Sequence, residues 1–446
     1  MKKVDLVPIA IGLLLLAACS GQPAETQEPP PRDVQSPMPT QPPAPTATAT
    51  PEPPPPATPS EVAPRPNAVT FRDDGTIMLD GEPVFLFGFY HVSLNGPRRS
   101  QLLVDDVNTI ADAGFDLVHA FIGQDDPQVQ EILDTAEQRE VYIIAQFWWG
   151  PNRMREALTL FRDDPALIGW MVADDFSSPW DGPETSPEEV KARTDVVHEL
   201  DEQGFAYGAA AGDPRYPTQD YTEVMDAFGI EVYPVSSLNR PFETVLEESV
   251  ANYAHNRAIL PDNKPMFALP QTFAWSDGRY PTPAETRNFI FGALINNANS
   301  ILAYTFWDQG GLLPENNPDQ WQELILLKQD VDKFKPVLLD GSLSTYDPLG
   351  SIDSIYPLTR GSFPPGVEKA RIHAGIWEDN GNVYVVVLNT SQTEVKQAAI
   401  PLPQGVTGDP VPFYNSARYG TGLTIQDGQL VGSVNPEEVH VYQIHG

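Results

Sequence analysis

The sequence predicts a (β/α)8 barrel followed by a small antiparallel β-sandwich, and three observations lead to this fold class. Eight apolar, strand-like runs recur between about residues 70 and 340, with amphipathic helical stretches between them. Strands that alternate with helices form a parallel sheet, and eight such units over about 270 residues close into a barrel. After about Pro336 the helical pattern stops, and short strands separated by Gly, Asn, Asp and Pro turns indicate the sandwich.

The first ordered element is a β-hairpin that turns at Asp80 and Gly81, because an Asp-Gly pair favours a tight two-residue turn. The predicted barrel strands are "VFLFGFY", "FDLVHAFI", "VYIIAQFWW", "LIGWMVAD", "FAYGAAAG", "FGIEVYPV", "PMFALPQTF" and "SILAYTFW". Helical patterns between them include "LLVDDVNTIADAG", "PQVQEILDTAEQRE", "MREALTLFRDD", "PEEVKARTDVVHELDEQG" and "PAETRNFIFGALINNA". A doubly wound open sheet is the alternative, but no glycine-rich phosphate loop follows any of these strands.

The sandwich is predicted from the runs "ARIHAGIWEDNGNVYVVVLNTS", "EVKQAAIPLP" and "EEVHVYQIH".

The chain then divides into four parts. They are a signal peptide with a lipidated cysteine (1–19), a stalk (20–67), the barrel (68–337) and the β-sandwich (338–446).

The N-terminus has the layout of a secretory signal. Lys2 and Lys3 precede a short apolar stretch that ends in "LAAC", and this stretch is shorter than the about 20 residues that span a bilayer. "LAAC" resembles the lipobox of bacterial lipoproteins, which implies cleavage before Cys19 and lipid attachment to its sulfur. An ordinary signal peptide with a chance cysteine is the alternative. We expect a protein anchored in the cell envelope, with its domains on the extracytoplasmic side.

The composition excludes several kinds of cofactor and several kinds of binding partner. Cys19 is the only cysteine, so an intramolecular disulfide and cysteine-based zinc or iron–sulfur sites are excluded. The seven histidines lack the spacing of a zinc helix, and we expect neither a metal nor a cofactor. A formal net charge of -34 would repel nucleic acid and anionic lipid headgroups, so neither is an expected partner.

The segment 20–67 consists almost entirely of Pro, Thr, Ala, Glu and Gln, as in "PPAPTATATPEPPPPATP". It has no hydrophobic periodicity and predicts a disordered stalk with polyproline character. Because such chain extends by about 3.1 Å per residue, the stalk could hold a domain on the order of 100 Å from the membrane. This reach suits an enzyme that works outside the cell, and it suits an adhesin equally well.

Polar and aromatic residues gather where the predicted strands end, which is where (β/α)8 barrels carry their chemistry. Aromatic rings fit the apolar face of a sugar ring, and carboxylates and amides fit its hydroxyls, so we expect an oligo- or polysaccharide partner. Core packing is the alternative role for each aromatic. The predicted substrate-binding residues are Tyr90, His91, His119, Gln146, Trp148, Trp149, Tyr233, Gln271, Trp275 and Trp307.

Several of these segments resemble barrel glycoside hydrolases. "FRDDPALIGWMVADDFSSP" is similar to their fourth-strand segment, which ends in the catalytic acid/base glutamate. "GEPVFLFGFYHVS" resembles their first strand, "FGIEVYPV" their sixth, and "KPMFALPQTFAW" and "NSILAYTFWD" their seventh and eighth. The resemblance spans roughly residues 70 to 340 and implies a glycosidase-like barrel, to which a trailing β-sandwich is a common addition.

Two departures from the family pattern affect the expected mechanism. Asp175 stands at the position of the acid/base Glu, and the resemblance makes it the general acid, with Asp174 orienting it. Gln271 stands on the seventh strand, where retaining members place a nucleophilic Glu, and an amide cannot form the glycosyl-enzyme ester. The shorter Asp175 side chain favours an inverting mechanism, whose carboxyls lie about 6.5–9.5 Å apart. The partner carboxylate remains open among Asp308, Glu231 and Asp213.

Two functions therefore remain. The first is a surface-anchored glycoside hydrolase that cleaves an extracellular glycan by acid/base chemistry. The second is a non-catalytic glycan-binding or adhesive lipoprotein with a degenerate glycosidase site. A purely structural envelope protein would leave the aromatic residues at the strand ends unexplained.

Overall fold

The structure is a computed structural model, and it describes residues 67–91, 102–123, 127–147, 151–176, 185–212, 218–235, 245–275, 278–308, 311–346 and 372–445. All of them belong to one of the chain's two units, Val62–Gly446. The eight gaps between positions 92 and 310 each follow a barrel strand. Cys19, the stalk up to residue 66, Trp148, Trp149 and Asp213 lie outside the described residues.

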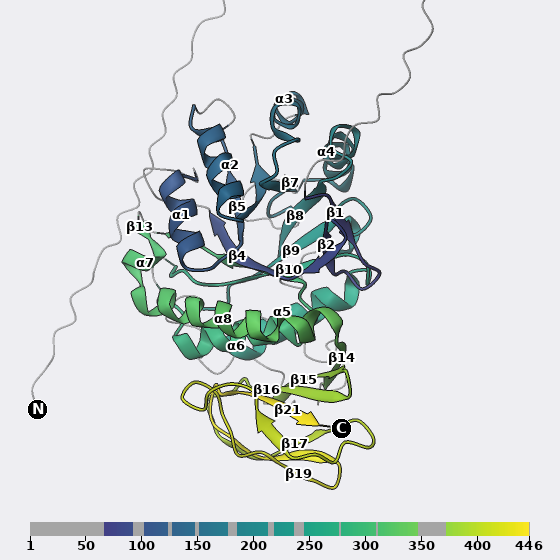
Figure 1. Cartoon of the computed structure of the whole chain (residues 1–446), viewed down its shortest axis with the longest axis vertical. Helices are drawn as coiled ribbons and strands as arrows, with labels where there is room; N and C mark the ends of the chain where they lie inside the picture. Colours follow the sequence, from purple (N-terminus) through teal and green to yellow (C-terminus); the bar gives the residue numbers. More distant parts are fainter. Residues whose placement is uncertain are drawn as a thin grey trace, which may run out of the picture. The chain divides into compact units, whose positions relative to one another are not determined.

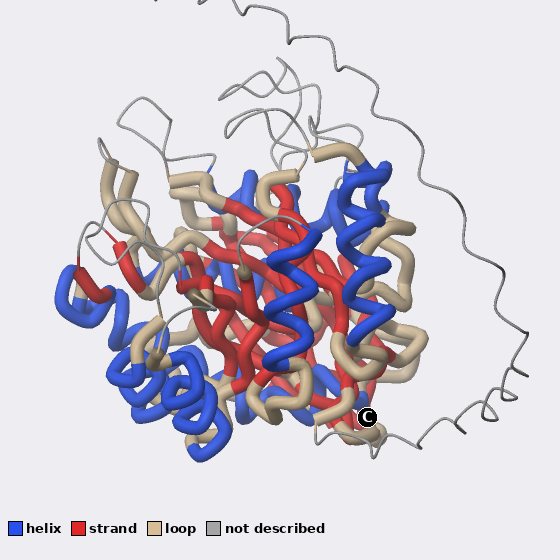
Figure 2. Tube along the Cα trace, turned by 90° about the horizontal axis from the view of Figure 1, so that it is seen from above, coloured by secondary structure: helices blue, strands red, loops and turns tan. Residues whose placement is uncertain are grey.

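Eight parallel strands close into a barrel, as the sequence predicts (Figures 1 and 2). Consecutive strands are neighbours, and the last pairs with the first through the register Tyr304 to Tyr90. Figure 2 shows the strands inside and the helices around them. The strands are β4 (Leu86–His91), β5 (Leu117–Phe121), β6 (Tyr142–Gln146), β7 (Leu167–Ala173), β8 (Phe205–Ala211), β9 (Ala227–Val232), β10 (Met266–Pro270) and β11 (Ser300–Tyr304).

The helices lie mostly where the amphipathic patterns predict them. At two of them, capping residues in the sequence define where the helix begins. Ser186 with Glu189 and Thr282 with Glu285 form capping boxes at the first turns of α4 and α6, and a proline follows each cap. The helices are α1 (Val104–Asp112), α2 (Val129–Gln138), α3 (Pro151–Phe161), α4 (Pro187–Leu200), α5 (Val245–Ile259), α6 (Pro283–Leu294), α7 (Leu313–Asn316), α8 (Pro318–Asp340) and the 3-10 helix η1 (Thr218–Tyr221).

The helices α5 and α8 were not marked by the sequence analysis. α5 buries polar residues as well as apolar ones along most of its length, among them Glu247, Ser249 and Asn252. A helix that is covered on several sides loses the one-sided hydrophobic pattern that reveals a surface helix. α8 continues through Pro336 to Asp340, so the C-terminal sheets begin beyond position 337. Among the described residues, no helix combines the length and the apolar character needed to cross a membrane.

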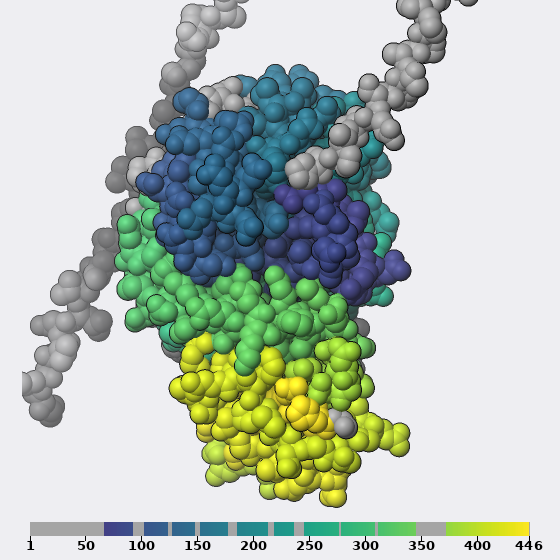
Figure 3. All heavy atoms as spheres, viewed as in Figure 1, coloured from purple at the N-terminus to yellow at the C-terminus, as the bar shows by residue number. Residues whose placement is uncertain are grey.

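The predicted hairpin is present and covers the amino-terminal end of the barrel. Its strands are β2 (Ile77–Leu79) and β3 (Glu82–Val84), and β1 (Val69–Phe71) pairs with β2 to complete a three-stranded sheet. Its turn uses left-handed backbone at Asp80 (φ 50°) and Gly81 (φ 85°), as a two-residue hairpin turn requires. Ile77 and Leu79 pack into the barrel interior with Leu86. The dark purple hairpin residues also form part of the surface seen in Figure 3.

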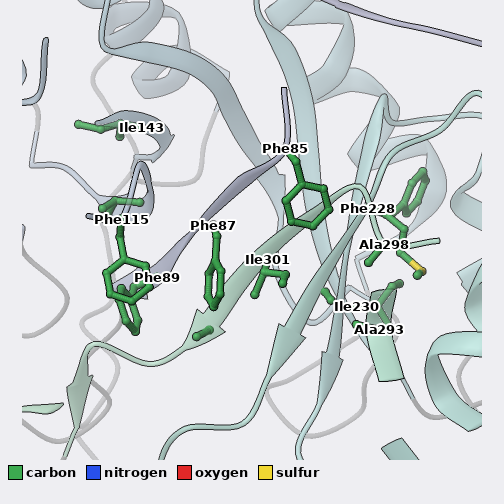
Figure 4. Close-up of a cluster of buried hydrophobic side chains, with 14 of the residues drawn as sticks. Phe85, Phe87, Phe89, Phe115, Ile143, Phe228, Ile230, Ala293, Ala298 and Ile301 are labelled. Atoms are coloured by element: carbon green, nitrogen blue, oxygen red, sulfur yellow. The ribbon is translucent and has the colours of Figure 1, made fainter. Parts of the chain in front are cut away.

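Side chains alternate between the barrel interior and the layer under the helices. On β4, Leu86 and Tyr90 belong to the interior cluster, whereas Phe87 and Phe89 belong to the helix-facing one. Figure 4 shows part of the helix-facing layer, in which the Phe115 ring lies 5.4 Å from Phe87 and 4.7 Å from Phe89. The alternation fixes which residues at the strand ends face the barrel axis.

The C-terminal part is built from two antiparallel sheets, as predicted. Their facing sides share one core, to which Ile376 and Val385 come from the first sheet and Ile400 and Leu430 from the second. The first sheet contains β14 (Ser342–Tyr346), β15 (Ile372–Asp379), β16 (Asn382–Asn389), β18 (Pro410–Pro412) and β21 (Val439–His445). The second contains β17 (Val395–Pro401), β19 (Thr424–Gln426) and β20 (Gln429–Val434).

Candidate active site

Asp174 is the carboxylate that points into the barrel at the end of β7. The hydroxyl of Tyr90, which is 1% exposed, donates a hydrogen bond of 3.0 Å to Asp174 Oδ1 from the opposite side of the interior. The same hydroxyl lies 3.4 Å from the sulfur of Met171, an interior residue of β7. A hydrogen bond donated to a carboxylate favours its ionised form. This hydrogen bond therefore fixes the position of the Asp174 carboxyl group in the barrel interior.

A break in the strand pleat decides which aspartate faces inward. Met171 lies in the interior cluster, whereas Val172 and Ala173 both belong to the helix-facing cluster. The pairing of β7 with β8 shifts register between Met171 and Ala173, as at a β-bulge. Strict alternation from Met171 would have brought Asp175 inward, and the extra residue brings Asp174 there instead.

Glu231 shares the interior with Asp174. It follows Gly229 at the next inward position of β9, and a side chain placed on Gly229 would collide with the Tyr207 hydroxyl. Burial raises the pKa of Tyr207 well above its usual value, and the charges of Glu231 and Asp174 raise it further. The pKa of Tyr90 is raised by burial first and then by Asp174, Tyr207 and Glu231. Both phenols therefore stay neutral near pH 7. The charges of Asp174 and Glu231 each contribute to the raised pKa of both phenols.

Asp175 lies where the chain leaves the barrel. Its backbone is left-handed (φ 45°), a conformation that is uncommon for a residue with a side chain. The next residue, Phe176, packs against Tyr221 with ring centroids 4.4 Å apart. Burial raises the pKa of Tyr233, and Glu231, Tyr304, Asp175 and Asp174 raise it further, in that order. The charge of Asp175 thus acts on the same phenol as those of Glu231 and Asp174.

A series of aromatic rings connects this interior to the surface. Tyr233 and Tyr304 have centroids 5.0 Å apart, and Tyr304 lies 5.2 Å from Phe273. Phe273 in turn lies 4.8 Å from Trp275, whose residue surface is 38% exposed. Trp275 is therefore available for stacking, whereas Trp307, at 6% exposed, is mostly buried.

Gln271 joins two loops at the end of the barrel. It is fully buried, and its Oε1 accepts a hydrogen bond of 2.8 Å from the Val235 backbone N–H. Its Nε2 donates to the carbonyl oxygens of Val235 (2.8 Å) and Phe273 (3.1 Å). These bonds use the side-chain amide to hold the segments after β9 and β10, which carry Tyr233 and Trp275.

We predict that Gln271→Ala lowers the free energy of unfolding by about 2–4 kcal/mol, because it leaves buried backbone groups without partners at about 1–3 kcal/mol each. Denaturant unfolding monitored by circular dichroism measures the change. Gln130→Ala is the control, since Gln130 is exposed and donates to Asp134, also exposed, at 2.7 Å. A weaker affinity for glycan with unchanged stability would instead support the predicted role of Gln271 in binding substrate.

The two predicted histidines differ in their surroundings. His91, 1% exposed, lies with its Nε2 3.3 Å from Asp106 Oδ2 of α1, and its ring lies 5.9 Å from Phe306, a helix-facing residue. His91 therefore packs toward α1.

His119 faces the interior, with its ring centroid 3.9 Å from that of Tyr90. Tyr207, which the sequence analysis did not select, lies 5.8 Å from His119. Strand alternation alone could have pointed to Tyr207, since it is two positions from the inward Phe205.

The remaining predicted residues lie near the strand ends or outside the described residues. Gln146 ends β6 and is partly exposed. Trp307 and Asp308 form β12 (Trp307–Asp308), which pairs with β13 (Gly311–Leu312), but the side chain of Asp308 is not among those described. Within the described residues, no three or more His, Cys, Asp or Glu side chains are grouped to hold a metal ion.

The closed barrel with its C-terminal antiparallel sheets is the fold of the barrel glycoside hydrolases. The chain is similar to a family 5 glycoside hydrolase from Bacteroides vulgatus, with 13% identity, a TM-score of 0.55, and coverage of 85% of this chain and 93% of that one. It is also similar to a family 27 β-L-arabinopyranosidase from Geobacillus stearothermophilus in complex with arabinose. Here the identity is 10% and the TM-score 0.52, with 81% of this chain and 97% of that one covered.

A third similar structure is AmyP in complex with maltotriose, with 10% identity, a TM-score of 0.51, and coverage of 81% of this chain and 97% of that one. These alignments cover more of the chain than the barrel alone provides, so they extend into the C-terminal sheets. No protein-family model matches the sequence, and no curated protein matches it. At such low identity the comparisons define the fold, and the chemistry has to be argued from the site.

Proposed function

We propose that this protein is a glycoside hydrolase that cleaves glycosidic bonds of an extracellular glycan, with Asp174 and Glu231 as its carboxylate pair. The observation that carries the proposal is the place of both residues at the interior of the barrel: the Tyr90 hydroxyl donates to Asp174, and Glu231 is the next inward residue of β9 after Gly229, which lies against the Tyr207 hydroxyl. Glycoside hydrolysis requires two carboxyl groups that flank the bond, one ionised and one able to donate a proton.

The roles follow from the contacts of each group. Asp174 is the ionised partner, because the Tyr90 hydroxyl donates to it. Glu231 is then the proton donor to the leaving oxygen. The sequence analysis gave this role to Asp175, but the bulge in β7 supports Asp174 as the inward aspartate, and Asp175 follows it where the chain leaves the barrel.

One barrel strand separates the two strands that carry the proposed pair. β8 separates β7 from β9, so the backbones that carry the two carboxylates are about 10 Å apart, twice the usual strand spacing. The inward positions of β8 beyond Tyr207 are Ala209 and Ala211, which have the smallest side chains that a strand can present short of glycine. Glycosidases hold their two carboxyl groups about 5–9.5 Å apart, and side chains that reach inward from backbones at this spacing can meet that requirement.

A glycan panel tests the proposal. The folded protein is incubated with plant, fungal and bacterial polysaccharides and with neutral hexasaccharides of glucose, xylose, mannose and galactose, and reducing ends are measured over time. Release of reducing sugar from at least one member is expected. Binding without release, detected as a change in tryptophan fluorescence, would favour the non-catalytic glycan-binding lipoprotein instead.

We further propose that the mature protein is attached to the membrane through a lipid on Cys19, with the stalk carrying the barrel away from the surface. The motif "LAAC" and the Pro/Thr-rich segment behind it support this arrangement. Cys19→Ser is expected to move the protein from the membrane to the soluble fraction on cell fractionation. If wild type and variant partition alike, the lipid anchor is wrong.

A further inference from the structure

His119 is a buried polar residue in the interior of the barrel. It lies on β5, two positions from the interior residue Leu117, and pairs in register with Tyr90 on one side and Ile144 on the other. It is fully buried, and its ring lies between Tyr90 at 3.9 Å and Tyr207 at 5.8 Å. These are the two phenols whose pKa values are raised by the charges of Asp174 and Glu231. His119 therefore borders the proposed site.

Neither ring nitrogen of His119 has a hydrogen-bond partner among the described residues. Buried polar atoms in native proteins are almost always hydrogen-bonded, and the exceptions need an explanation. The other interior positions at this level accept apolar side chains, as Ile144 shows, so packing alone does not require an imidazole. An imidazole kept at this position without a partner among the described residues indicates a ligand that binds to it.

The chemistry of the imidazole defines that partner. Burial, and to a lesser degree the charge of His91, lowers the pKa of His119 to about 3, so the ring is neutral near pH 7. A neutral imidazole offers one N–H donor and one nitrogen acceptor. A hydroxyl group also donates once and accepts, so it matches this pair of functions. An ammonium group would use only the acceptor, and a carboxylate only the donor.

The charges of the described residues around His119 disfavour an anionic sugar unit. The groups that face this region are neutral phenols and the carboxylates of Asp174 and Glu231. Lys328 is the only buried Lys or Arg among the described residues, and it pairs with Asp116 and Asp332 instead. The carboxylate of a uronic acid would therefore meet the charge of Asp174, and no buried Lys or Arg free of another partner would offset it among the described residues.

We propose that His119 is a specificity-determining residue that hydrogen-bonds a hydroxyl of an uncharged sugar unit held between Asp174 and Glu231. The inference rests on the proposed function and adds to it the class of sugar and the residue that selects it. His119 contacts the bound sugar directly and takes no part in proton transfer.

The test compares His119→Phe with Tyr253→Phe. Phenylalanine keeps the ring beside Tyr90 and removes both nitrogens. Tyr253 is the matched control, because it is also fully buried and its hydroxyl also has no partner among the described residues, but it lies on α5 in the helix-facing layer. His119→Asn, which retains a donor and an acceptor, is the second variant. Affinities for the neutral hexasaccharides and for hexagalacturonate are measured by calorimetry, and Tm by circular dichroism.

We expect wild type to bind a neutral hexasaccharide and not hexagalacturonate. His119→Phe should weaken that binding about 10- to 100-fold, as loss of a buried hydrogen bond to ligand does, while its Tm is unchanged or higher. His119→Asn should retain more of the affinity, and Tyr253→Phe should retain all of it.

Equal affinity of wild type and His119→Phe, or equal affinity of wild type for hexagalacturonate, would overturn the inference. If wild type binds no glycan, the proposed function fails on that result alone, and Tm then decides about His119. A lower Tm for His119→Phe would mean that the nitrogens have structural partners, which overturns the inference. An unchanged or higher Tm would show that the nitrogens lack structural partners, and the ligand of His119 would then be something other than a sugar, which also overturns the inference.

Discussion

Asp174→Asn is expected to lower the turnover of a cleaved glycan by about 10²–10⁴-fold, the usual contribution of an acid/base group. Asparagine has nearly the same size, and its carbonyl oxygen can still accept the hydrogen bond from Tyr90, so the fold and the affinity should change little. The negative charge that Tyr90 holds in place is lost, however, and with it the group that stabilises or attacks the reacting carbon. The measurement is kcat and KM on the substrate that the glycan panel identifies.

Three further variants make the result specific. Glu231→Gln should cause a loss of similar size, and Asp175→Asn a smaller one. Asp195→Asn is the control, because Asp195 lies exposed on α4 and pairs with Lys191. If Asp175→Asn abolishes turnover and Asp174→Asn does not, then Asp175 is the general acid, as the sequence resemblance implies. The anomeric configuration of fresh product, followed by NMR, separates the two roles of Asp174: inversion indicates a base and retention a nucleophile.

Arg418→Ala is expected to destabilise the whole protein by about 2–4 kcal/mol, because Arg418 links the C-terminal sheets to the barrel through a partly buried ionic network. Its guanidinium contacts Asp330 and lies 2.6 Å from Glu323 Oε1, both on α8. Arg287 of α6 lies 2.9 Å from the same Glu323 oxygen and donates to the Arg418 carbonyl. Removing Arg418 leaves Glu323, which is 7% exposed, with one cation fewer.

Chemical denaturation monitored by tryptophan fluorescence measures this effect. Arg155→Ala is the matched control, since Arg155 also contacts a carboxylate with its guanidinium, but the Arg155 and Glu199 side chains are 42% and 57% exposed. Exposed pairs contribute about 0–1 kcal/mol, so this variant should remain close to wild type. Equal losses in the two variants would contradict the argument from burial. A separate unfolding transition for the C-terminal sheets would show that the network does not join the two parts into one cooperative unit.

The strands and most helices could be predicted because their signals are local. The apolar runs and the amphipathic patterns each lie within about ten to twenty residues, and the turn at Asp80 and Gly81 is encoded by those two residues alone. α5 was not predicted, because its surroundings come from distant parts of the chain. Glu247, for example, is buried against His373 and Thr390 of the C-terminal part.

The sequence could also name the candidate residues of the site, but not their contacts. Gln271 stands at the end of a strand like the other candidates, yet its amide is bound to the backbone of Val235 and Phe273. His91 and His119 look alike in the sequence, since each falls near a strand end. One packs toward Asp106 of α1, and the other lies among the phenols of the interior. Which face of a strand a residue occupies depends on the neighbouring strands, and sequence spacing gives this only when the pleat is regular.

The sequence by itself determined the barrel, the order of its strands and the gathering of carboxylates at their ends, because hydrophobic periodicity and strand order follow from the chain locally. Only the tertiary structure decided between Asp174 and Asp175. The register shift between β7 and β8 after Met171 is a property of two paired strands. Since one extra residue moves every later side chain to the opposite face, that shift turns Asp174 toward Tyr90 and leaves Asp175 where the chain departs from the barrel.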